Sequence, residues 1–185
     1  YDLCNQSIKK VRHRGPDNLG IYKDKSCFLG HTRLSIIGLE QTSNQPLEFG
    51  DLIITYNGEI FNYVELKAEL EENGYQFSTN SDTEVVIKAY DFWGEKCFEK
   101  FNGMWAICIY NRVKKEAIVS RDRFGQKPLF YLKNKDAIYF ASEIQQLSSM
   151  NEPEVNFEVI QNFLKEGTFE SQGRTFFKEI FEFPK

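Results

Sequence analysis

Thr55-Tyr56-Asn57-Gly58-Glu59-Ile60-Phe61-Asn62 is the stretch of sequence that decides the fold of this chain. A β-rich segment over residues 51–56 leads into it, and a helical pattern over residues 62–73 follows it at once. Asn-Gly is the strongest short signal for a hairpin turn, but a hairpin needs a returning strand. Because Asn62 is the expected helix N-cap, no room is left for that strand, and the spacing favours a strand-to-helix elbow.

The chemistry of this elbow points to an oxyanion site. The side-chain amide of Asn57 and the backbone N–H of Gly58 form a compact pair of hydrogen-bond donors. Such donors stabilise the negative charge that a carbonyl oxygen develops in acyl transfer. The sequence therefore predicts Asn57 and Gly58 as catalytic residues.

The order of the remaining elements predicts an α+β fold. Strand-like runs come first, two helices follow, then four short β-rich runs and further helices, an order typical of antiparallel sheets covered by helices. The expected strands cover residues 27–37, 51–56, 104–110, 116–120, 128–132 and 137–141. The expected helices cover residues 1–12, 62–73, 95–101 and 157–165, with others beginning at Ser81 and near Ser142. Ser81 and Glu84 have the spacing of a capping box.

Composition excludes several classes of protein. The chain has 185 residues, 41% of them apolar and 27% charged, as expected for one globular domain. A net charge of −4 argues against binding to nucleic acid or an anionic membrane surface. No apolar run approaches the roughly 20 residues that span a bilayer. The four separated cysteines and two histidines do not form a zinc motif, and we expect a reducing, cytoplasmic setting.

Two charged residues are candidates for gripping a substrate. Arg33 could bind a carboxylate through two parallel hydrogen bonds, and Asp82 could pair with an ammonium group. Together they would suit the α-carboxylate and α-amino group of an amino acid. The simpler alternatives are an exposed strand charge for Arg33 and a helix-stabilising carboxylate for Asp82, which lies in the first turn of its helix.

A series of motifs resembles the glutamine amidotransferase domain of asparagine synthetase. The matches run in order from about residue 12 to residue 145 and cover most of the chain. They are His13-Arg14-Gly15-Pro16-Asp17, Arg33-Leu34-Ser35-Ile36, Gln45-Pro46-Leu47, Tyr56–Tyr63, Ser81-Asp82-Thr83-Glu84, Phe101–Met104, Arg121–Tyr131 and Phe140–Glu143. Pro16 favours the asparagine synthetase branch over amidotransferases acting on phosphoribosyl pyrophosphate or glucosamine phosphate.

This resemblance implies a fold, a reaction and partners. The fold is the four-layer αββα sandwich of N-terminal-nucleophile hydrolases, with two antiparallel sheets. The reaction is the hydrolysis of L-glutamine to glutamate and ammonia by an N-terminal cysteine. The ammonia is used for ATP-dependent amidation of aspartate by a C-terminal synthetase domain of the same full-length chain. The resemblance implies no cofactor for the present domain, since ATP and Mg²⁺ belong to the synthetase domain.

The resemblance also assigns roles to individual residues. Asn57 and Gly58 would form the oxyanion hole, Arg33 would hold the glutamine α-carboxylate, and Asp82, helped by Glu59, would hold the α-amino group. The remaining pocket residues would be Leu34, Ser35, Ile36 and Ile37, which line it with their backbone.

The chain departs from the family at the nucleophile. Cys4 is followed by Asn5 in a helix-like context, whereas the family has its cysteine on the first strand, so we do not assign Cys4. We expect the nucleophile upstream of Tyr1. Residues 1–185 are then one amidotransferase domain cut at both ends, without its synthetase half.

Two other functions stay open. The domain could be a catalytically silent relative that binds glutamine or a protein partner, or it could deliver ammonia to a different acceptor. The sequence does not decide between a monomer and a homodimer.

Overall fold

The computed structural model describes residues 2–35, 40–150, 152–167 and 173–185. It divides the chain into two compact units, which are described separately below. The larger unit is Arg12–Lys127, and the smaller unit combines Tyr1–Val11 with Pro128–Lys185. The predicted functional residues all belong to the larger unit. None of the described helices is long and apolar enough to cross a membrane.

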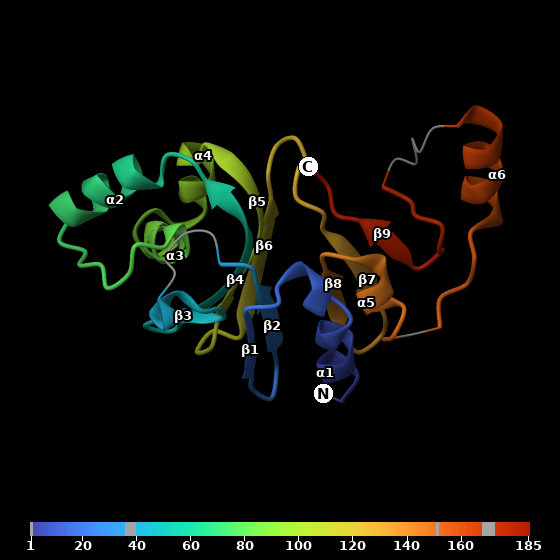
Figure 1. Ribbon diagram of the computed structural model, residues 1–185, viewed down its shortest axis with the longest axis horizontal. Helices are drawn as coiled ribbons and strands as arrows, with labels where there is room; N and C mark the ends of the chain where they lie inside the picture. The colour runs from blue at the N-terminus through green and yellow to red at the C-terminus, as the bar shows by residue number, and fades with distance from the viewer. Residues whose placement is uncertain (1, 36–39, 151, 168–172) are drawn as a thin grey trace. The chain divides into compact units, whose positions relative to one another are not determined.

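The larger unit is built on an antiparallel sheet with the strand order β3-β4-β5-β6 (Figure 1). The strands are β3 (Leu47–Phe49), β4 (Leu52–Ile60), β5 (Gly103–Asn111) and β6 (Glu116–Arg121). The helices of this unit are α2 (Tyr63–Glu72), α3 (Asp82–Trp93), the 3₁₀ turn η3 (Gly94–Lys96) and α4 (Cys97–Lys100). Alternate residues of β4, including Ile54, Tyr56 and Ile60, form one buried core with residues of α2 and α3.

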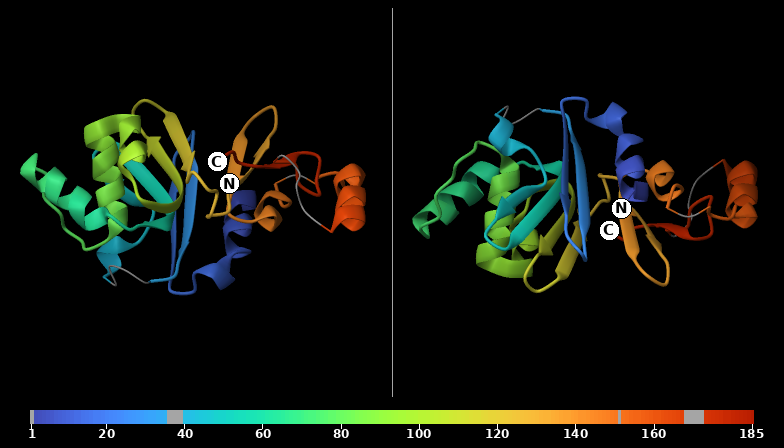
Figure 2. Two further views of the ribbon diagram at one scale, coloured as in Figure 1. Left: turned by 90° about the horizontal axis from the view of Figure 1, so that it is seen from above. Right: turned by 90° about the horizontal axis from the view of Figure 1, so that it is seen from below.

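The other face of this sheet carries a β-hairpin. Its strands are β1 (Asn18–Lys23) and β2 (Phe28–Arg33), preceded by the 3₁₀ turn η1 (Arg12–Arg14) and followed by η2 (Gln41–Ser43). Leu29 of β2 packs in one buried cluster with Ile53 of β4 and Tyr110 of β5. Figure 2 shows the hairpin and α3 on opposite faces of the sheet. The odd-numbered positions of β4 therefore face the hairpin, and the even-numbered ones face the helices.

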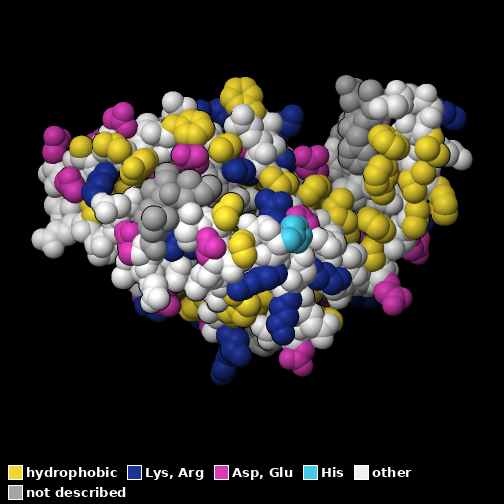
Figure 3. All heavy atoms as spheres, viewed as in Figure 1, with side chains coloured by type: hydrophobic (Ala, Val, Ile, Leu, Met, Phe, Trp, Pro, Cys, Tyr) yellow, Lys and Arg dark blue, Asp and Glu magenta, His cyan; other side chains and the backbone are white. Residues whose placement is uncertain are grey.

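The smaller unit has a sheet of its own with the order β8-β7-β9. Its elements are α1 (Asp2–Lys9), β7 (Phe130–Lys133), β8 (Ile138–Ala141), α5 (Ile144–Leu147), α6 (Phe157–Glu166) and β9 (Ile180–Glu182). Leu132 and Ile180 centre its core, and the Ser7 hydroxyl holds α1 to α5 by donating to the Gln146 carbonyl at 3.1 Å. Hydrophobic side chains gather on α6 (Figure 3), where Phe157 and Leu164 are exposed.

Most predicted elements are present, but the prediction for the central stretch was wrong. Asn57 and Gly58 lie neither in a hairpin turn nor in an elbow, because β4 continues through them to Ile60. Their partners in β5 are Ala106 and Trp105. This pairing overrides the local turn preference of Asn-Gly, since β5 supplies the strand partner from some 45 residues further along the chain. Strands β1, β3 and β9 were not separately predicted.

The two predicted helix caps also differ from expectation. Asn62 stands at the N-cap of α2 but makes no capping bond. Its side chain instead holds the chain between α4 and β5, donating to the Lys100 carbonyl at 3.0 Å and accepting from the Asn102 N–H at 2.9 Å.

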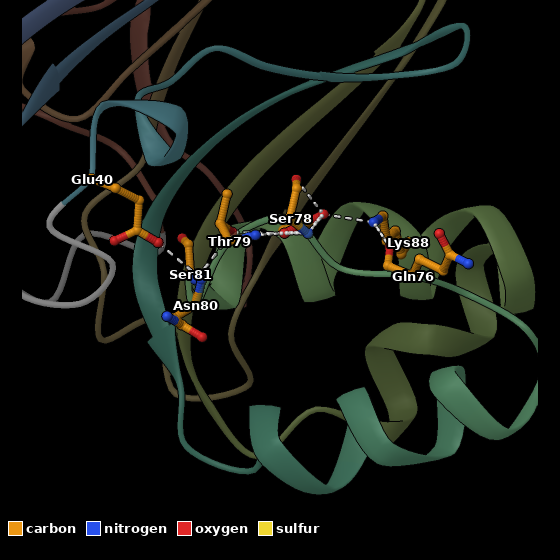
Figure 4. A network of polar contacts seen from close by, with 8 residues as sticks. Glu40, Gln76, Ser78, Thr79, Asn80, Ser81 and Lys88 are labelled. Atoms are coloured by element: carbon orange, nitrogen blue, oxygen red, sulfur yellow. Dashed lines mark hydrogen bonds and ion pairs between the residues drawn. The ribbon is translucent and has the colours of Figure 1, made fainter.

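At α3, Ser81 does cap the helix, accepting from the Thr83 N–H at 3.2 Å. Glu84 does not complete the capping box with the Ser81 N–H. It reaches further back and accepts from the backbone N–H groups of Ser78 at 3.0 Å and Thr79 at 2.7 Å, and it pairs with Lys88 at 2.6 Å (Figure 4). One buried carboxylate thus fixes the N-terminal part of α3 and the loop before it.

This network predicts a stability change for Glu84→Gln. Burial opposes ionisation, but the bonds from Lys88, Ser78 and Thr79 hold the pKa of Glu84 at about 2. A carboxylate with a depressed pKa stabilises the fold above its unfolded pKa, and this stabilisation is lost as the pH falls from about 4.5 to about 2. We expect Glu84→Gln to lower the free energy of unfolding by about 3 kcal/mol at pH 7, because Lys88 keeps a buried charge.

Urea unfolding at several pH values measures this effect. The deficit of the Glu84→Gln variant should shrink between pH 4.5 and pH 2. Glu69→Gln is the matched control, because Glu69 pairs with Lys100 at the surface and should change stability by less than about 1 kcal/mol. Equal effects of the two substitutions would contradict the role given to Glu84.

Candidate functional site

The segment that leaves β2 is shaped by the motif His13–Asp17. Asp17 donates its N–H to the Arg33 carbonyl at 3.0 Å, and its carboxylate accepts from the Ser35 N–H at 2.7 Å. Gly15 passes so close to β2 that a Cβ there would lie 2.3 Å from the Thr32 carbonyl carbon. Glycine is therefore required at this point, and the motif positions the chain at Arg33 to Ser35.

Arg33 is the last residue of β2 and is 7% exposed, so the alternative of an exposed strand charge is wrong. Its Nη1 atom donates to the Glu40 carbonyl at 3.1 Å and to Asn44 Oδ1 at 2.8 Å. These bonds hold the guanidinium in one orientation. Such an orientation is a precondition for binding a carboxylate through two parallel hydrogen bonds.

Gln45 connects the Arg33 segment to β4 and α3. Its Oε1 accepts from the Tyr56 N–H at 2.6 Å, and its Nε2 donates to the Tyr56 carbonyl at 3.1 Å. The same Nε2 lies 3.2 Å from the Thr83 hydroxyl oxygen. The side chain thus satisfies the backbone of Tyr56 as a neighbouring strand would. The sequence singled out Gln45 as a motif residue but gave it no role.

Asp82 begins α3, as predicted, but its carboxylate points to β4. Oδ2 accepts from the Tyr56 hydroxyl at 2.8 Å and from the Ile60 N–H at 3.2 Å. Burial raises the pKa of Asp82, and the nearby charge of Glu59 adds to this rise. Arg33 bonds to Asn44, the residue before Gln45. Gln45 bonds to Tyr56, which in turn bonds to Asp82, and to Thr83, the residue after Asp82. The structure therefore brings Arg33 and Asp82 into one connected network.

The edge of β4 presents backbone donors along its second half. In an antiparallel ladder, successive residues direct their N–H and C=O groups alternately toward one neighbouring strand and then the other. Tyr56 directs its backbone to Gln45, and Ile60 directs its N–H to Asp82, both away from β5. Gly58 lies two residues from each of them along the strand, so its N–H also points away from β5. Strand β3 pairs only with residues 52–54 and does not cover this edge.

Asn57 adds a side-chain donor beside the Gly58 N–H. Its Nδ2 atom is buried and has no hydrogen-bond partner among the described residues. Unsatisfied buried donors are rare in folded proteins and call for an explanation such as a ligand. Gly58 itself is required by packing, because a Cβ there would lie 2.2 Å from the Met104 carbonyl oxygen. Asn57 and Gly58 thus lie next to each other within a strand, and the Asn57 amide donor is unpaired among the described residues.

The other predicted pocket residues have mixed outcomes. Glu59 lies half-buried in β4. Leu34 is 57% exposed, and Ser35 is half-buried and fixed by Asp17. Ile36 and Ile37 lie outside the described residues.

The cysteines of the described chain offer no activated thiol in this unit. All four are free, and Cys4 lies in α1 of the smaller unit, in the helical context expected for it. Burial raises the pKa of Cys27 to about 11 and that of Cys97 and Cys108 to about 12. A reactive cysteine needs the opposite shift. The described residues also contain no cluster of His, Cys, Asp and Glu that could hold a metal ion.

Comparison with known proteins is consistent with this geometry. A model of a glutamine amidotransferase domain matches residues 2–185. Asparagine synthetase (glutamine-hydrolysing) 1 of Bacillus subtilis is 41% identical over 88% of this chain and 26% of its own length. Putative asparagine synthetase (glutamine-hydrolysing) 2 of Methanocaldococcus jannaschii is 38% identical over 80% of this chain and 32% of its own length. The chain thus spans about a quarter to a third of these relatives.

A solved structure establishes the fold independently. The glutamine phosphoribosylpyrophosphate amidotransferase of Bacillus subtilis, complexed with ADP and GMP, aligns with a TM-score of 0.69. It is 22% identical and covers 80% of this chain and 40% of that chain. The α+β fold of N-terminal-nucleophile hydrolases, with antiparallel sheets and helices, is confirmed. The chain belongs to the glutamine amidotransferase family and is a glutamine amidotransferase domain of the kind found in asparagine synthetases.

Proposed function

We propose that this domain hydrolyses the side-chain amide of L-glutamine to glutamate and ammonia. The observation that carries the proposal is the buried, unsatisfied Nδ2 atom of Asn57 beside the Gly58 N–H at the open edge of β4. A preorganised pair of donors in a site shielded from water stabilises an oxyanion strongly, because it needs no reorganisation during the reaction.

The substrate is held at its amino-acid end by two opposite charges. Arg33, oriented by Glu40 and Asn44, would bind the α-carboxylate, and Asp82 would bind the α-ammonium with help from Glu59. The Gln45 bridge fixes the spacing between these groups and the oxyanion donors. Leu34 and Ser35, and with them Ile36 and Ile37, would line the pocket through their backbone.

In this mechanism a cysteine thiolate attacks the γ-carbonyl carbon of glutamine. Asn57 and Gly58 bind the resulting oxyanion. The proton that the thiol lost on forming the thiolate passes to the amide nitrogen, the C–N bond breaks, and ammonia leaves. Water then cleaves the thioester to glutamate. Cys27, Cys97 and Cys108 have raised pKa values, and Cys4 lies in a helix and not on a strand, so we propose that the nucleophile precedes Tyr1.

We further propose that the ammonia serves an asparagine synthetase-like reaction. The relatives carry that name and are longer than this chain, which supports a synthetase domain in the full-length protein. That domain, and not the present one, would use ATP, Mg²⁺ and aspartate, and we place the reaction in the cytoplasm.

Glutamate release by the full-length protein tests the proposal. We expect L-glutamine to yield equimolar glutamate and ammonia, and aspartate with ATP to convert that ammonia to asparagine. A glutamine-like electrophile should label an N-terminal cysteine and stop both reactions. A full-length protein that binds glutamine without releasing glutamate would be a catalytically silent glutamine-binding protein. One that releases ammonia but does not convert aspartate to asparagine would deliver the ammonia to another acceptor.

Asn57→Ala should lower the turnover number for glutamine hydrolysis roughly 10²–10³-fold, the usual cost of removing one oxyanion donor. The thermal unfolding temperature should change little, because Nδ2 donates no hydrogen bond to any described residue. Asn62→Ala is the contrasting control. Asn62 makes bonds to Lys100 and Asn102, so its loss should reduce stability and leave the chemical step nearly unchanged. Equal turnover in the two variants would exclude Asn57 from the chemistry.

Arg33→Lys should raise the KM for glutamine at least about 10-fold with a smaller change in the turnover number. Lysine cannot reproduce the two parallel hydrogen bonds of a guanidinium to a carboxylate. Arg112→Lys, at an exposed arginine that pairs with Glu48, is the matched control. Steady-state kinetics of glutamate release separate the two parameters, and an unchanged KM for Arg33→Lys would assign the α-carboxylate to another residue.

A further inference from the structure

His31 of β2 carries a second buried polar atom without a partner. Its Nδ1 atom is inaccessible and has no hydrogen-bond partner among the described residues, the same condition as Asn57 Nδ2. The imidazole does bond to the backbone of Tyr56. The Tyr56 N–H is taken by Gln45, so the imidazole donates to the Tyr56 carbonyl, and it does so through Nε2.

These bonds define the chemical character of Nδ1. Burial lowers the pKa of His31 to about 4, and the charge of Arg33 adds a smaller effect in the same direction. The ring is therefore neutral at physiological pH. A neutral imidazole that donates through Nε2 keeps a lone pair on Nδ1, which makes that atom a hydrogen-bond acceptor.

The fold directs this acceptor to the neighbourhood of Asn57. Leu29 and His31 are two residues apart in β2 and so share a face. Leu29 packs against Ile53, and Asn57 lies on the same face of β4 as Ile53. His31 also bonds to Tyr56, the residue directly before Asn57. A buried acceptor and a buried donor, both unsatisfied, therefore lie between β2 and β4.

We propose that His31 Nδ1 and Asn57 Nδ2 together recognise a primary carboxamide. Asn57 donates to the carbonyl oxygen, and His31 accepts from the amide nitrogen. The pair matches the two sides of the glutamine side chain, and in this respect the inference rests on the proposed function. It adds a specificity-determining residue to which the sequence motifs assign no role.

The same pair disfavours the product. The side-chain carboxylate of glutamate offers only acceptor oxygens, so one of them would face the Nδ1 lone pair. Sites built to hydrogen-bond a particular substrate group reject analogues that lack it, because a buried polar atom is left unpaired. His31 thus favours binding of glutamine and departure of glutamate.

Amide and ester substrates test this role in the full-length protein. His31→Phe keeps a ring of similar size without nitrogen atoms, and His31→Leu is the second variant, should the Phe variant fail to fold. We expect either to lower kcat/KM for L-glutamine about 10-fold, the value of one hydrogen bond at its usual upper range. The kcat/KM for the γ-methyl ester of L-glutamate, which has no amide N–H, should change less than about threefold.

Binding of glutamine and glutamate to the wild-type protein gives an independent measurement. In steady-state kinetics of the full-length protein, the inhibition constant of glutamate should be at least about 10-fold above the KM for glutamine, and the two His31 variants should reduce this ratio. Equal losses for amide and ester, or a ratio near one in the wild-type protein, would overturn the role of His31 while glutamine hydrolysis stands. A wild-type protein that neither binds nor hydrolyses glutamine would overturn the proposed function itself.

Discussion

The two hydrogen bonds between the Gln45 side chain and the backbone of Tyr56 are the contact on which the site depends. They replace a strand at the edge of β4 with a single side chain. The Gly58 N–H lies just beyond that side chain along the same edge. Arg33 is held through Asn44, the residue before Gln45, and Asp82 is held through Tyr56. Had β3 continued along β4, its own backbone would occupy the donors of Gly58.

Buried carboxylates give this arrangement its rigidity. Asp82 ties α3 to β4, and Glu84 ties α3 to the preceding loop. Asp122 closes the far end of the sheet, accepting from the N–H groups of Phe124 and Gln126 at 3.0 Å and from Lys127 at 3.1 Å. Each such carboxylate satisfies several backbone donors at once, which offsets the cost of burying its charge. The motifs Ser81–Glu84 and Arg121–Tyr131 thus stabilise the fold through their carboxylates, apart from any contact with substrate.

The sequence located most of the elements and the main site residues, but it misjudged their local geometry. Helices at 63–72 and 82–93 and the strands β5, β6, β7 and β8 lie close to where periodicity placed them. Asn57-Gly58 was taken for an elbow because a turn preference is local, whereas its partner strand is distant in sequence. Glu84 was taken for half of a capping box because the spacing fitted, but the Ser81 N–H donates to the Thr79 hydroxyl, and Glu84 accepts from the N–H groups of Ser78 and Thr79. The role of Gln45 had no signal beyond its place in a motif, and His31 lay outside the motifs altogether.

The sequence by itself determined which chemical groups are available: two adjacent donors, an arginine and a carboxylate, in motifs typical of glutamine amidotransferases. It also determined the α+β class, because hydrophobic periodicity is a property of neighbouring residues. Only the tertiary structure decided that Asn57 Nδ2 and His31 Nδ1 are buried without partners, and that Arg33 and Asp82 share one network through Gln45. Whether a buried polar atom has a hydrogen-bond partner depends on residues that are distant in the sequence, and the neighbouring residues do not predict which of these will lie nearby.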